Sequence, residues 1–293
     1  MSWCSGLEAI CQADVPLRDH TWYGLGGPAA WLVSPRDESE LATVLARCTT
    51  EKMQWRILGH GANLLVPDDG FQGVVIRLAG EVWERVAFRP PLVEAAAGMD
   101  FPKLVKHSLE RGLVGLENLA GIPGSVGGVI RQNAGGRYGT IADYVRQVRL
   151  LGADGEVQVR AATEMAFAYR SSQLDGGVVV AATLELQTGD STAALERHRT
   201  IWSEKYASQP PVSARSAGCI FKNPPGGAAG RLIDEAGLKG QRCGAAEIST
   251  KHANFIVAHP GATTRNVLDL ITLAKERVFE RTGVQLELEV EVW

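Results

Sequence analysis

Apolar and polar positions in the first half of the chain follow two different periods. They predict helices over residues 41–48 and 101–109, and strands over Trp55–Leu58 and Val74–Leu78. The first helix follows a capping-box pattern in Ser34–Asp37. The second is closed by Gly112, since glycine suits the left-handed position after a helix. The strand Trp55–Leu58 leads directly into a glycine loop that begins at Gly59.

The second half of the chain predicts strands first and mainly helices later. Its predicted elements are strands over Val145–Leu151, Glu156–Val159, Val178–Leu186 and Leu286–Val292, and helices over residues 193–206, 229–236 and 267–278. Ala153, Asp154 and Gly155 form a hairpin signal between the first two strands. Gly237 and Gly283 follow the last two helices as stops. Helices and strands mixed with a hairpin predict an α+β fold rather than a strictly alternating parallel-sheet protein.

Glycine is frequent in this chain, and its excess falls in short runs. There are 33 glycines among 293 residues, above the usual ~7%. The runs lie at residues 24–27, 59–61, 121–128, 135–139 and 226–230. Each run stands between well-patterned segments, which is typical of loops that approach a ligand with bare backbone. A tight turn is the alternative interpretation of any single run.

The common nucleotide-binding motifs are absent from these loops. Gly59-His60-Gly61 continues without the third glycine of the dinucleotide fingerprint, and a turn rather than a helix follows it. The sequence also lacks the G-x-x-x-x-G-K-[ST] pattern of nucleotide triphosphatases. The loops can still donate several backbone N–H groups to a pyrophosphate. The chain therefore fits a dinucleotide bound by a less common motif.

Charge and composition exclude several classes of protein. With 30 Lys and Arg against 33 Asp and Glu, and a formal charge of −3, the chain is not expected to bind nucleic acid. Its longest apolar stretch, Val178–Leu184, is far shorter than the ~20 residues of a membrane helix, and Met1–Gln12 lacks the order of a signal peptide. We expect a soluble cytoplasmic protein. The 5 cysteines are scattered, so neither a disulfide framework nor a metal site is predicted.

A set of spaced motifs carries a family resemblance. In chain order these are RILGHGANLLVPDDGFQGVVIRL, GLENLAGIPGSVGGVIRQNAGGRYG, FAYRSS, SAGCIFKNPPGGAAGRLIDEAGLKG, KHANFIV and GVQLELEV. Together they resemble the UDP-N-acetylenolpyruvoylglucosamine reductase family, from about Thr21 to the last residue. The chain is similar to the short form of that family, which lacks a tyrosine-bearing loop and part of the substrate domain.

The resemblance implies an α+β fold with a two-lobed FAD-binding domain of the vanillyl-alcohol-oxidase (PCMH) type and a C-terminal α+β substrate-binding domain. We place the lobes at residues 1–80 and 81–189, and the substrate-binding domain at residues 190–293. The resemblance also implies non-covalent FAD, NADPH as co-substrate and UDP-N-acetylglucosamine enolpyruvate as substrate. We expect a monomer.

The family's flavin loops match two of the glycine runs. In the family, loops matching residues 59–64 and 121–128 enclose the FAD pyrophosphate, and residues matching 133–135 lie beside the flavin. The predicted cofactor-binding residues are Gly59, His60, Gly61, Ala62, Asn63, Leu64, Gly121, Ile122, Pro123, Gly124, Ser125, Gly127, Gly128, Asn133, Ala134 and Gly135. The family usually has serine where this chain has Ala62, so backbone donors must bind the phosphate without that hydroxyl.

The resemblance also assigns the chemistry to named residues. In the family, hydride adds to the terminal methylene carbon of the enolpyruvyl ether, and the enolate-like anion that forms then takes a proton. Arg170 matches the arginine that stabilises this anion. Cys219 stands where the family has a serine that delivers the proton, and a thiol is a much stronger acid than a hydroxyl. Without the motifs, Arg170 would be an ordinary surface arginine and Cys219 a small buried apolar residue.

The remaining family positions are less sharply placed. Glu289 matches the family's catalytic glutamate, although a second register would select Glu291 on the same strand face. The predicted substrate-binding residues are Tyr169, Lys205, Asn223 and Lys239. Two other functions stay open: an FAD-dependent alcohol oxidase of the same fold, and a flavin-binding or nucleotide-sugar-binding module that has lost its chemistry.

Overall fold

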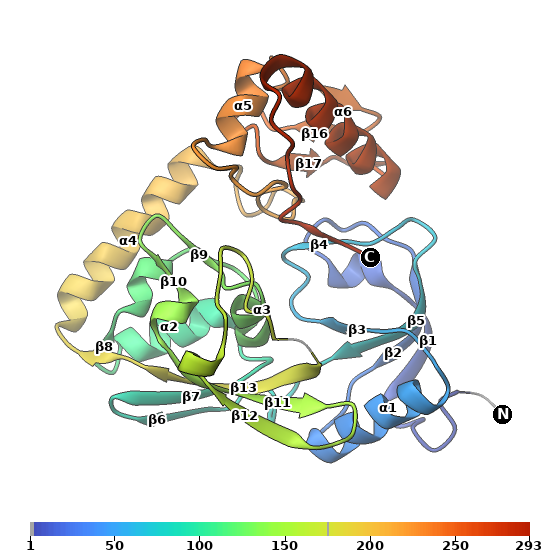
Figure 1. The fold of residues 1–293 in the computed structure, drawn as a ribbon, viewed down its shortest axis with the longest axis vertical. Coiled ribbons are helices and arrows are strands. Elements are labelled where there is room, and N and C mark those ends of the chain that lie inside the picture. Colours follow the sequence, from blue (N-terminus) through green and yellow to red (C-terminus); the bar gives the residue numbers. More distant parts are fainter. Residues whose placement is uncertain (1–2, 175) are drawn as a thin grey trace. The chain divides into compact units, whose positions relative to one another are not determined.

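The computed structural model describes residues 3–174 and 176–293 (Figure 1). The chain forms two compact units, each with its own hydrophobic core. Unit 1 comprises residues 1–13, 31–59 and 73–204, and unit 2 comprises residues 14–30, 60–72 and 205–293. The predicted three-part division, with limits at residues 80 and 189, stays a prediction.

The chain crosses between the units five times, within three strands and one helix and once in the loop between Gly59 and His60. Strands β1 (Cys11–Pro16), β2 (Pro28–Val33) and β5 (Phe71–Arg77) contain such crossings, and with β3 (Trp55–Leu58) they form a sheet of order β1-β2-β5-β3. Helix α4 (Ser191–Ser208) contains the last crossing.

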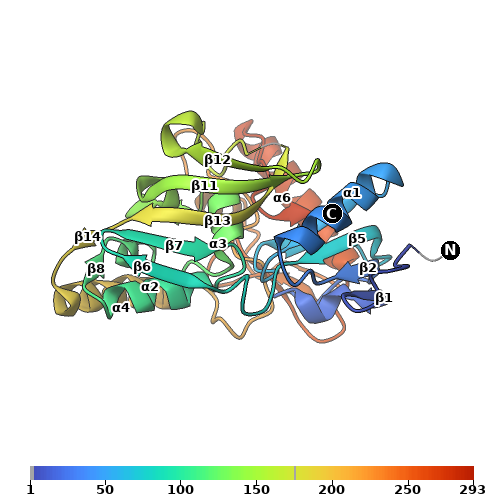
Figure 2. The same ribbon diagram turned by 90° about the horizontal axis from the view of Figure 1, so that it is seen from below.

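Unit 1 is built on a five-stranded antiparallel sheet. Figure 2 shows its order, β12 (Val157–Ala161), β11 (Val145–Gly152), β13 (Gly177–Glu185), β7 (Leu92–Ala96) and β6 (Val86–Arg89). Its other elements are α1 (Glu38–Thr50), α2 (Phe101–Leu109), α3 (Val126–Arg131), the pair β8 (Leu113–Val114) and β14 (Gln187–Thr188), the pair β9 (Gly135–Gly136) and β10 (Gly139–Thr140), and 3-10 turns at Leu116–Leu119, Ile141–Asp143 and Ala162–Glu164. The predicted hairpin is confirmed, because β11 and β12 pair antiparallel across it.

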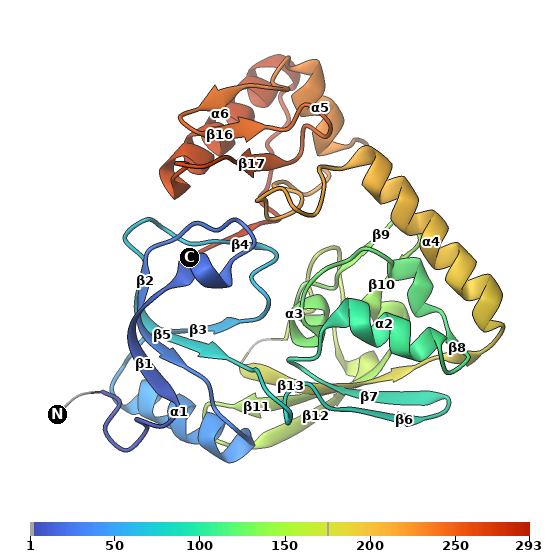
Figure 3. The same ribbon diagram turned by 180° about the vertical axis from the view of Figure 1, so that it is seen from behind.

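Unit 2 packs two helices with a small antiparallel sheet. Figure 3 shows α5 (Ala229–Glu235) and α6 (Thr264–Thr282) with β16 (Ala246–Ile248) and β17 (Ile256–Ala258). The sheet order is β15 (Arg242–Cys243), β16, β17, and α6 contacts all three strands. A further pair joins β4 (Leu64–Leu65) in parallel to β18 (Glu291–Val292), and a 3-10 turn lies at Leu17–His20.

The ends of the helices show how local sequence sets them. Gly237 and Gly283 adopt left-handed φ values of 75° and 71° after α5 and α6, so both predicted stops are confirmed. The capping box predicted at Ser34–Asp37 was wrong. The N-cap of α1 is Asp37, whose side chain accepts a hydrogen bond from the Glu40 backbone N–H at 2.8 Å. The Glu40 carboxylate accepts from the Arg36 N–H at 2.7 Å and not from Asp37, so the helix starts with a single side-chain cap.

The predicted last strand, Leu286–Val292, was also wrong in its extent. Only Glu291–Val292 is a strand, and Leu288 makes a single bridge to Phe221. The backbone N–H groups of Glu289 and Val290 both donate to the carbonyl of Ile220, at 2.8 and 3.3 Å. Consecutive N–H groups of a pleated strand point to opposite sides, so this shared acceptor interrupts the strand.

The described helices and side chains bear on membrane and metal binding. None of the helices described is both long and apolar enough to cross a membrane. Residues 3–174 and 176–293 contain no group of three or more His, Cys, Asp or Glu side chains placed to hold a metal ion.

Candidate functional site

The predicted site residues divide into two sets, one in each unit. The set in unit 1 comprises Gly59, the loop residues 121–128, Asn133, Ala134, Gly135, Tyr169 and Arg170. The set in unit 2 comprises His60, Gly61, Ala62, Asn63, Leu64, Lys205, Cys219, Asn223, Lys239 and Glu289. Contacts within each unit show how its own set is held.

In unit 1, the second glycine loop is fixed by its backbone and by one serine. Ser125 is the N-cap of α3 and accepts a hydrogen bond from the Gly128 N–H at 3.4 Å. Gly124 accepts a hydrogen bond from Phe101 at the start of α2, and its φ is +117°. A Cβ atom on Gly124 would meet no described atom within 4 Å. Bare backbone thus faces open space at this loop.

Gly59 approaches this second loop within unit 1. A Cβ atom on Gly59 would lie 2.6 Å from the Ser125 Oγ. A side chain at this position would displace the Ser125 hydroxyl, so glycine permits this close approach. The end of β3 and the loop that precedes α3 are therefore in direct contact.

Arg170 lies in a strained turn against the segment predicted to contact the flavin. Its Nη2 donates a hydrogen bond to the Gly135 carbonyl at 3.0 Å, and its guanidinium lies 5.0 Å from the centre of the Tyr169 ring. The Asn133 side chain donates to the Ala168 carbonyl at 2.9 Å. Asn133 and Arg170 have φ values of 40° and 55°, and such strain clusters at functional sites.

In unit 2, the backbone brings the Cys219 and Glu289 segments side by side. Ile220, which follows Cys219, accepts a hydrogen bond from the Glu289 N–H at 2.8 Å. Lys222 donates its N–H to Glu287 at 2.9 Å. Residues 220–222 and 287–290 thus form an irregular antiparallel pair, and Cys219 and Glu289 both belong to one local structure.

Asn254 also binds the backbone of residues 220 and 221, and the sequence pattern did not single it out. Its Oδ1 accepts from the Phe221 N–H at 2.9 Å, and its Nδ2 donates to the Phe221 carbonyl at 2.8 Å. Its own carbonyl accepts from the Ile220 N–H at 2.8 Å. Asn254 is buried, and a buried amide must find partners. The sequence feature that could have indicated its role is that Asn254 is the single polar residue in the otherwise apolar run ANFIV.

The three glutamates of the last segment differ in burial. Glu287 and Glu291 are exposed, whereas Glu289 is half-buried. Because the strand is interrupted, Glu289 and Glu291 do not share a regular strand face. This environment favours Glu289 over Glu291 as the catalytic candidate.

The predicted substrate-binding residues of unit 2 make local contacts of their own. The Asn223 Oδ1 accepts a hydrogen bond from the Ala229 N–H at 3.0 Å, at the start of α5. Lys239 pairs with Asp234 at 2.6 Å. Lys205 lies in the last turn of α4.

The first glycine loop requires glycine at Gly61. Its φ is +64°, and a Cβ atom there would lie 2.1 Å from the His20 carbonyl oxygen. Gly61 also accepts a hydrogen bond from the Trp22 N–H at 3.0 Å. The close approach of this loop to residues 20–22 is therefore possible only for a residue without a side chain.

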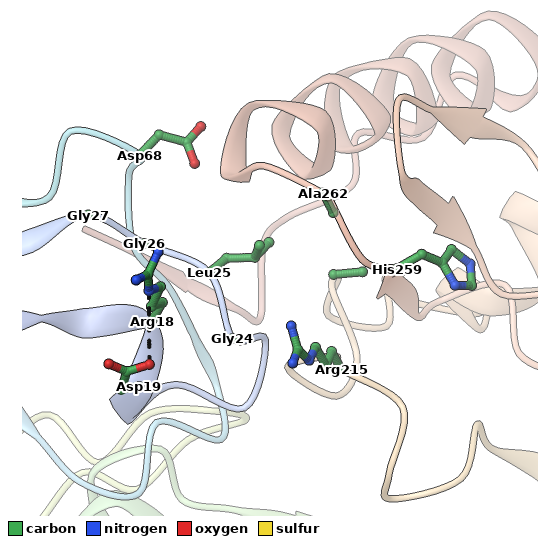
Figure 4. Close-up of a pocket in the computed structure, with 12 residues that line it drawn as sticks. Arg18, Asp19, Gly24, Leu25, Gly26, Gly27, Asp68, Arg215, His259 and Ala262 are labelled. Atoms are coloured by element: carbon green, nitrogen blue, oxygen red, sulfur yellow. Dashed lines mark ion pairs between the residues drawn. The ribbon is translucent and has the colours of Figure 1, made fainter.

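A cavity of about 570 Å³ in unit 2 contains none of the predicted catalytic residues (Figure 4). It is lined by the glycine run at 24–27, and the Arg215 side chain points into it. The Asp68 carboxylate accepts hydrogen bonds from the first turn of α6, and His259 points away and pairs with Glu247. The run at 24–27 also packs closely against Val66 and Asp68. The tight-turn interpretation therefore explains this run.

Comparison with known proteins agrees with both parts of the predicted fold. A family model described as FAD binding domain matches residues 29–160. A second, described as UDP-N-acetylenolpyruvoylglucosamine reductase, C-terminal domain, matches residues 209–293. The prediction of an α+β fold with a PCMH-type FAD-binding domain and a further C-terminal domain is confirmed.

Similar proteins match nearly the whole chain. UDP-N-acetylenolpyruvoylglucosamine reductase 2 of Symbiobacterium thermophilum is 41% identical over 95% of this chain and 90% of its own length. The reductase of Moorella thermoacetica is 40% identical over 99% of this chain and 95% of its own. The crystal structure of the UDP-N-acetylenolpyruvylglucosamine reductase from Thermus caldophilus is 41% identical, covers 97% of this chain and 98% of that one, and superposes with a TM-score of 0.82. The chain therefore belongs to the UDP-N-acetylenolpyruvoylglucosamine reductase family.

Proposed function

We propose that the chain reduces the enolpyruvyl group of UDP-N-acetylglucosamine enolpyruvate to UDP-N-acetylmuramate, a precursor of peptidoglycan, with NADPH as the reductant. Family membership supports the reaction class. The observation that carries the assignment of residues is the pairing of the Cys219 and Glu289 segments through the hydrogen bond from Glu289 N–H to Ile220.

The glycine loops fit a cofactor that carries a pyrophosphate. Gly61 and Gly124 have positive φ values, which favour glycine. Gly59 and Gly61 approach neighbouring atoms closely, and Gly124 faces open space with bare backbone. Backbone N–H groups presented in this way bind phosphate oxygens without basic side chains. We assign residues 59–64 and 121–128 to the FAD pyrophosphate, and Asn133–Gly135 to the flavin side of the cofactor. Bound FAD, once reduced by NADPH, supplies the hydride.

The chain's own residues then handle the negative charge and the proton. Hydride addition at the methylene carbon leaves an enolate-like anion next to the substrate carboxylate. Arg170 stabilises this anion, because a guanidinium stays charged and can bind a carboxylate with two donors. We assign Glu289 to the same stabilisation, because its segment pairs with that of Cys219. The Cys219 thiol gives its proton to the carbon, and the thiolate recovers a proton from solvent.

The nucleotide part of the substrate requires separate partners. We assign its binding to Tyr169, Lys205, Asn223 and Lys239. The contacts of Asn223 with α5 and of Lys239 with Asp234 support fixed positions for these two side chains. Fixed side chains lose little freedom when a ligand binds.

An anaerobic experiment tests the cofactor, the reductant and the substrate together. The purified protein should be yellow, NADPH should bleach the flavin absorbance, and the enolpyruvyl sugar nucleotide should restore it. NADH in place of NADPH tests the choice of reductant. Rapid reoxidation by oxygen with no response to the sugar nucleotide would favour the alcohol oxidase. A flavin that NADPH cannot reduce would favour the binding module, and a protein that takes up no FAD would overturn every flavin assignment.

A further inference from the structure

The side chain of Asn63 binds the backbone of Glu289. Its Nδ2 donates a hydrogen bond to the Glu289 carbonyl at 3.0 Å, across a separation of 226 residues. The Asn63 carbonyl in turn accepts from the Glu291 N–H at 3.1 Å. Immediately beyond it, Leu64 and Leu65 pair with Glu291 and Val292 in the β4–β18 ladder. Asn63 is therefore the first residue of a continuous series of hydrogen bonds between the first glycine loop and the last segment of the chain.

Glu289 is held on both of its peptide groups. Its N–H donates to the Ile220 carbonyl at 2.8 Å, next to Cys219, and its carbonyl accepts from Asn63. Fixing the groups on both sides of a Cα atom fixes φ and ψ at that residue, and the backbone conformation restricts the side-chain rotamer. The half-buried Glu289 carboxyl group is thereby held in one direction.

Ordinary strand pairing cannot supply the hydrogen bond that Asn63 makes. The strand is interrupted at Glu289 and Val290, where two consecutive N–H groups share the Ile220 carbonyl. At such an interruption a backbone carbonyl loses its ladder partner and needs another donor. An asparagine side chain provides that donor, whereas an aspartate of the same shape offers only acceptors at neutral pH.

We infer that Asn63 is a positioning residue for Glu289, and that it links the flavin loop to the residues proposed to act on the substrate. This inference rests on the proposed function. It gives the Asn63 side chain a role different from the cofactor contact expected from the sequence, since its amide binds Glu289. A phosphate contact from this residue would come from its backbone N–H.

The test compares Asn63→Asp with the parent protein in the two half-reactions, measured separately under anaerobic conditions. Aspartate keeps the size and the backbone of the loop but removes the donor. The negative charge that aspartate adds to the loop assigned to the FAD pyrophosphate should weaken FAD binding, so both half-reactions are measured on protein saturated with FAD. Flavin reduction by NADPH does not use Glu289 and should be slowed far less than reoxidation. Reoxidation by the enolpyruvyl sugar nucleotide should slow by about 10- to 100-fold, the effect of a small displacement of a reacting group.

A double-mutant cycle shows whether the effect passes through Glu289. In a Glu289→Gln background, Asn63→Asp should slow reoxidation by much less than it does in the parent, because coupled residues are not additive. Asn63→Ser serves as a second variant without the added charge, and thermal unfolding checks that each variant is folded.

Three results would overturn the inference. Reoxidation by FAD-saturated Asn63→Asp at the parent rate would do so, as would equal slowing of both half-reactions in FAD-saturated Asn63→Asp and Asn63→Ser, which would show that Asn63 acts on the flavin and not on Glu289. Full additivity with Glu289→Gln would show that the two residues act independently. Failure of the proposed function itself is a separate result, since the parent protein would then not be reoxidised by the sugar nucleotide at all.

Discussion

Cys219 is the residue at which this chain departs most clearly from the family pattern described above. It is half-buried, and the backbone that follows it is fixed by the bond from the Ile220 N–H to Asn254. Partial exposure suits proton exchange with solvent and differs from the full burial expected of a small apolar residue. The other thiol of unit 2, Cys243, binds Asp269 at 3.6 Å, and partial burial together with that carboxylate raises its pKa.

The role proposed for Cys219 predicts the order of activity among its variants. Cys219→Ser should retain substantial activity, because serine restores the family's own donor. Cys219→Ala should slow reoxidation by the sugar nucleotide by about 10²- to 10⁴-fold, the usual effect of losing a general acid. Stopped-flow absorbance of the flavin measures both rates. Cys243→Ala is the matched control and should match the parent. Parent-like turnover by Cys219→Ala would show that Cys219 is not the acid.

At the scale of elements, one carboxylate joins the three short strands of unit 2. Glu247 on β16 faces Arg242 on β15 at 2.6 Å, and the residue after β17, His259, lies 2.9 Å from the same Oε2 atom. Strands of two or three residues have few ladder hydrogen bonds, so this shared carboxylate adds an important link.

This link makes stability depend on pH. Partial burial raises the pKa of Glu247, but hydrogen bonds from His259 and Arg242 outweigh it, so the net pKa lies below its ordinary value of 4.5. A lowered carboxyl pKa adds stability above that ordinary value, and this stability is lost as pH falls through the lower, folded-state pKa. Glu247→Gln should therefore be less stable than the parent at pH 7 by about 1–2 kcal/mol.

Urea unfolding of both proteins at a series of pH values checks this prediction. The difference between them should narrow as the pH falls below 4.5, the ordinary carboxyl pKa. Glu276→Gln, which removes an exposed carboxylate from α6, controls for the general effect of lost charge. A stability difference that grows as the pH falls below 4.5 would contradict the conclusion that folding lowers the pKa of Glu247.

At the scale of the whole molecule, two units with separate cores are built from three chain segments each. Each unit also has its own set of predicted site residues. Cofactor binding should therefore appear in the stability of the molecule as well as in its activity, because a ligand that binds only the folded state stabilises it.

Removal of FAD should lower the midpoint of thermal unfolding, and added FAD should restore it. At a free concentration 100 times its dissociation constant, a ligand adds about 2.7 kcal/mol to the free energy of unfolding. Differential scanning calorimetry of the FAD-free protein across a titration measures this shift. Riboflavin is the matched control, because it has the same ring system without the pyrophosphate that the glycine loops are proposed to bind. Equal stabilisation by riboflavin would contradict that role of the loops.

Local features were predicted well where their causes are local. The helix stops at Gly237 and Gly283 and the β11–β12 hairpin depend on residues only a few positions apart, so the sequence pattern contains the necessary information. The capping box predicted at Ser34–Asp37 was wrong because several polar residues in that segment can cap a helix, and Asp37 alone is the N-cap. The family motifs likewise lie along the chain and can be found without a structure.

The sequence by itself determined the α+β class, the helix stops at Gly237 and Gly283, the glycine loops and the motifs that led to the family. Only the tertiary structure decided that Asn63, Asn254 and Glu289 share one hydrogen-bonded structure, and that the last segment is not a regular strand. The physical reason is distance along the chain. A period of 2 or 3.6 residues records which face of an element is buried. It does not record which carbonyl, 226 residues away, will accept a particular amide hydrogen.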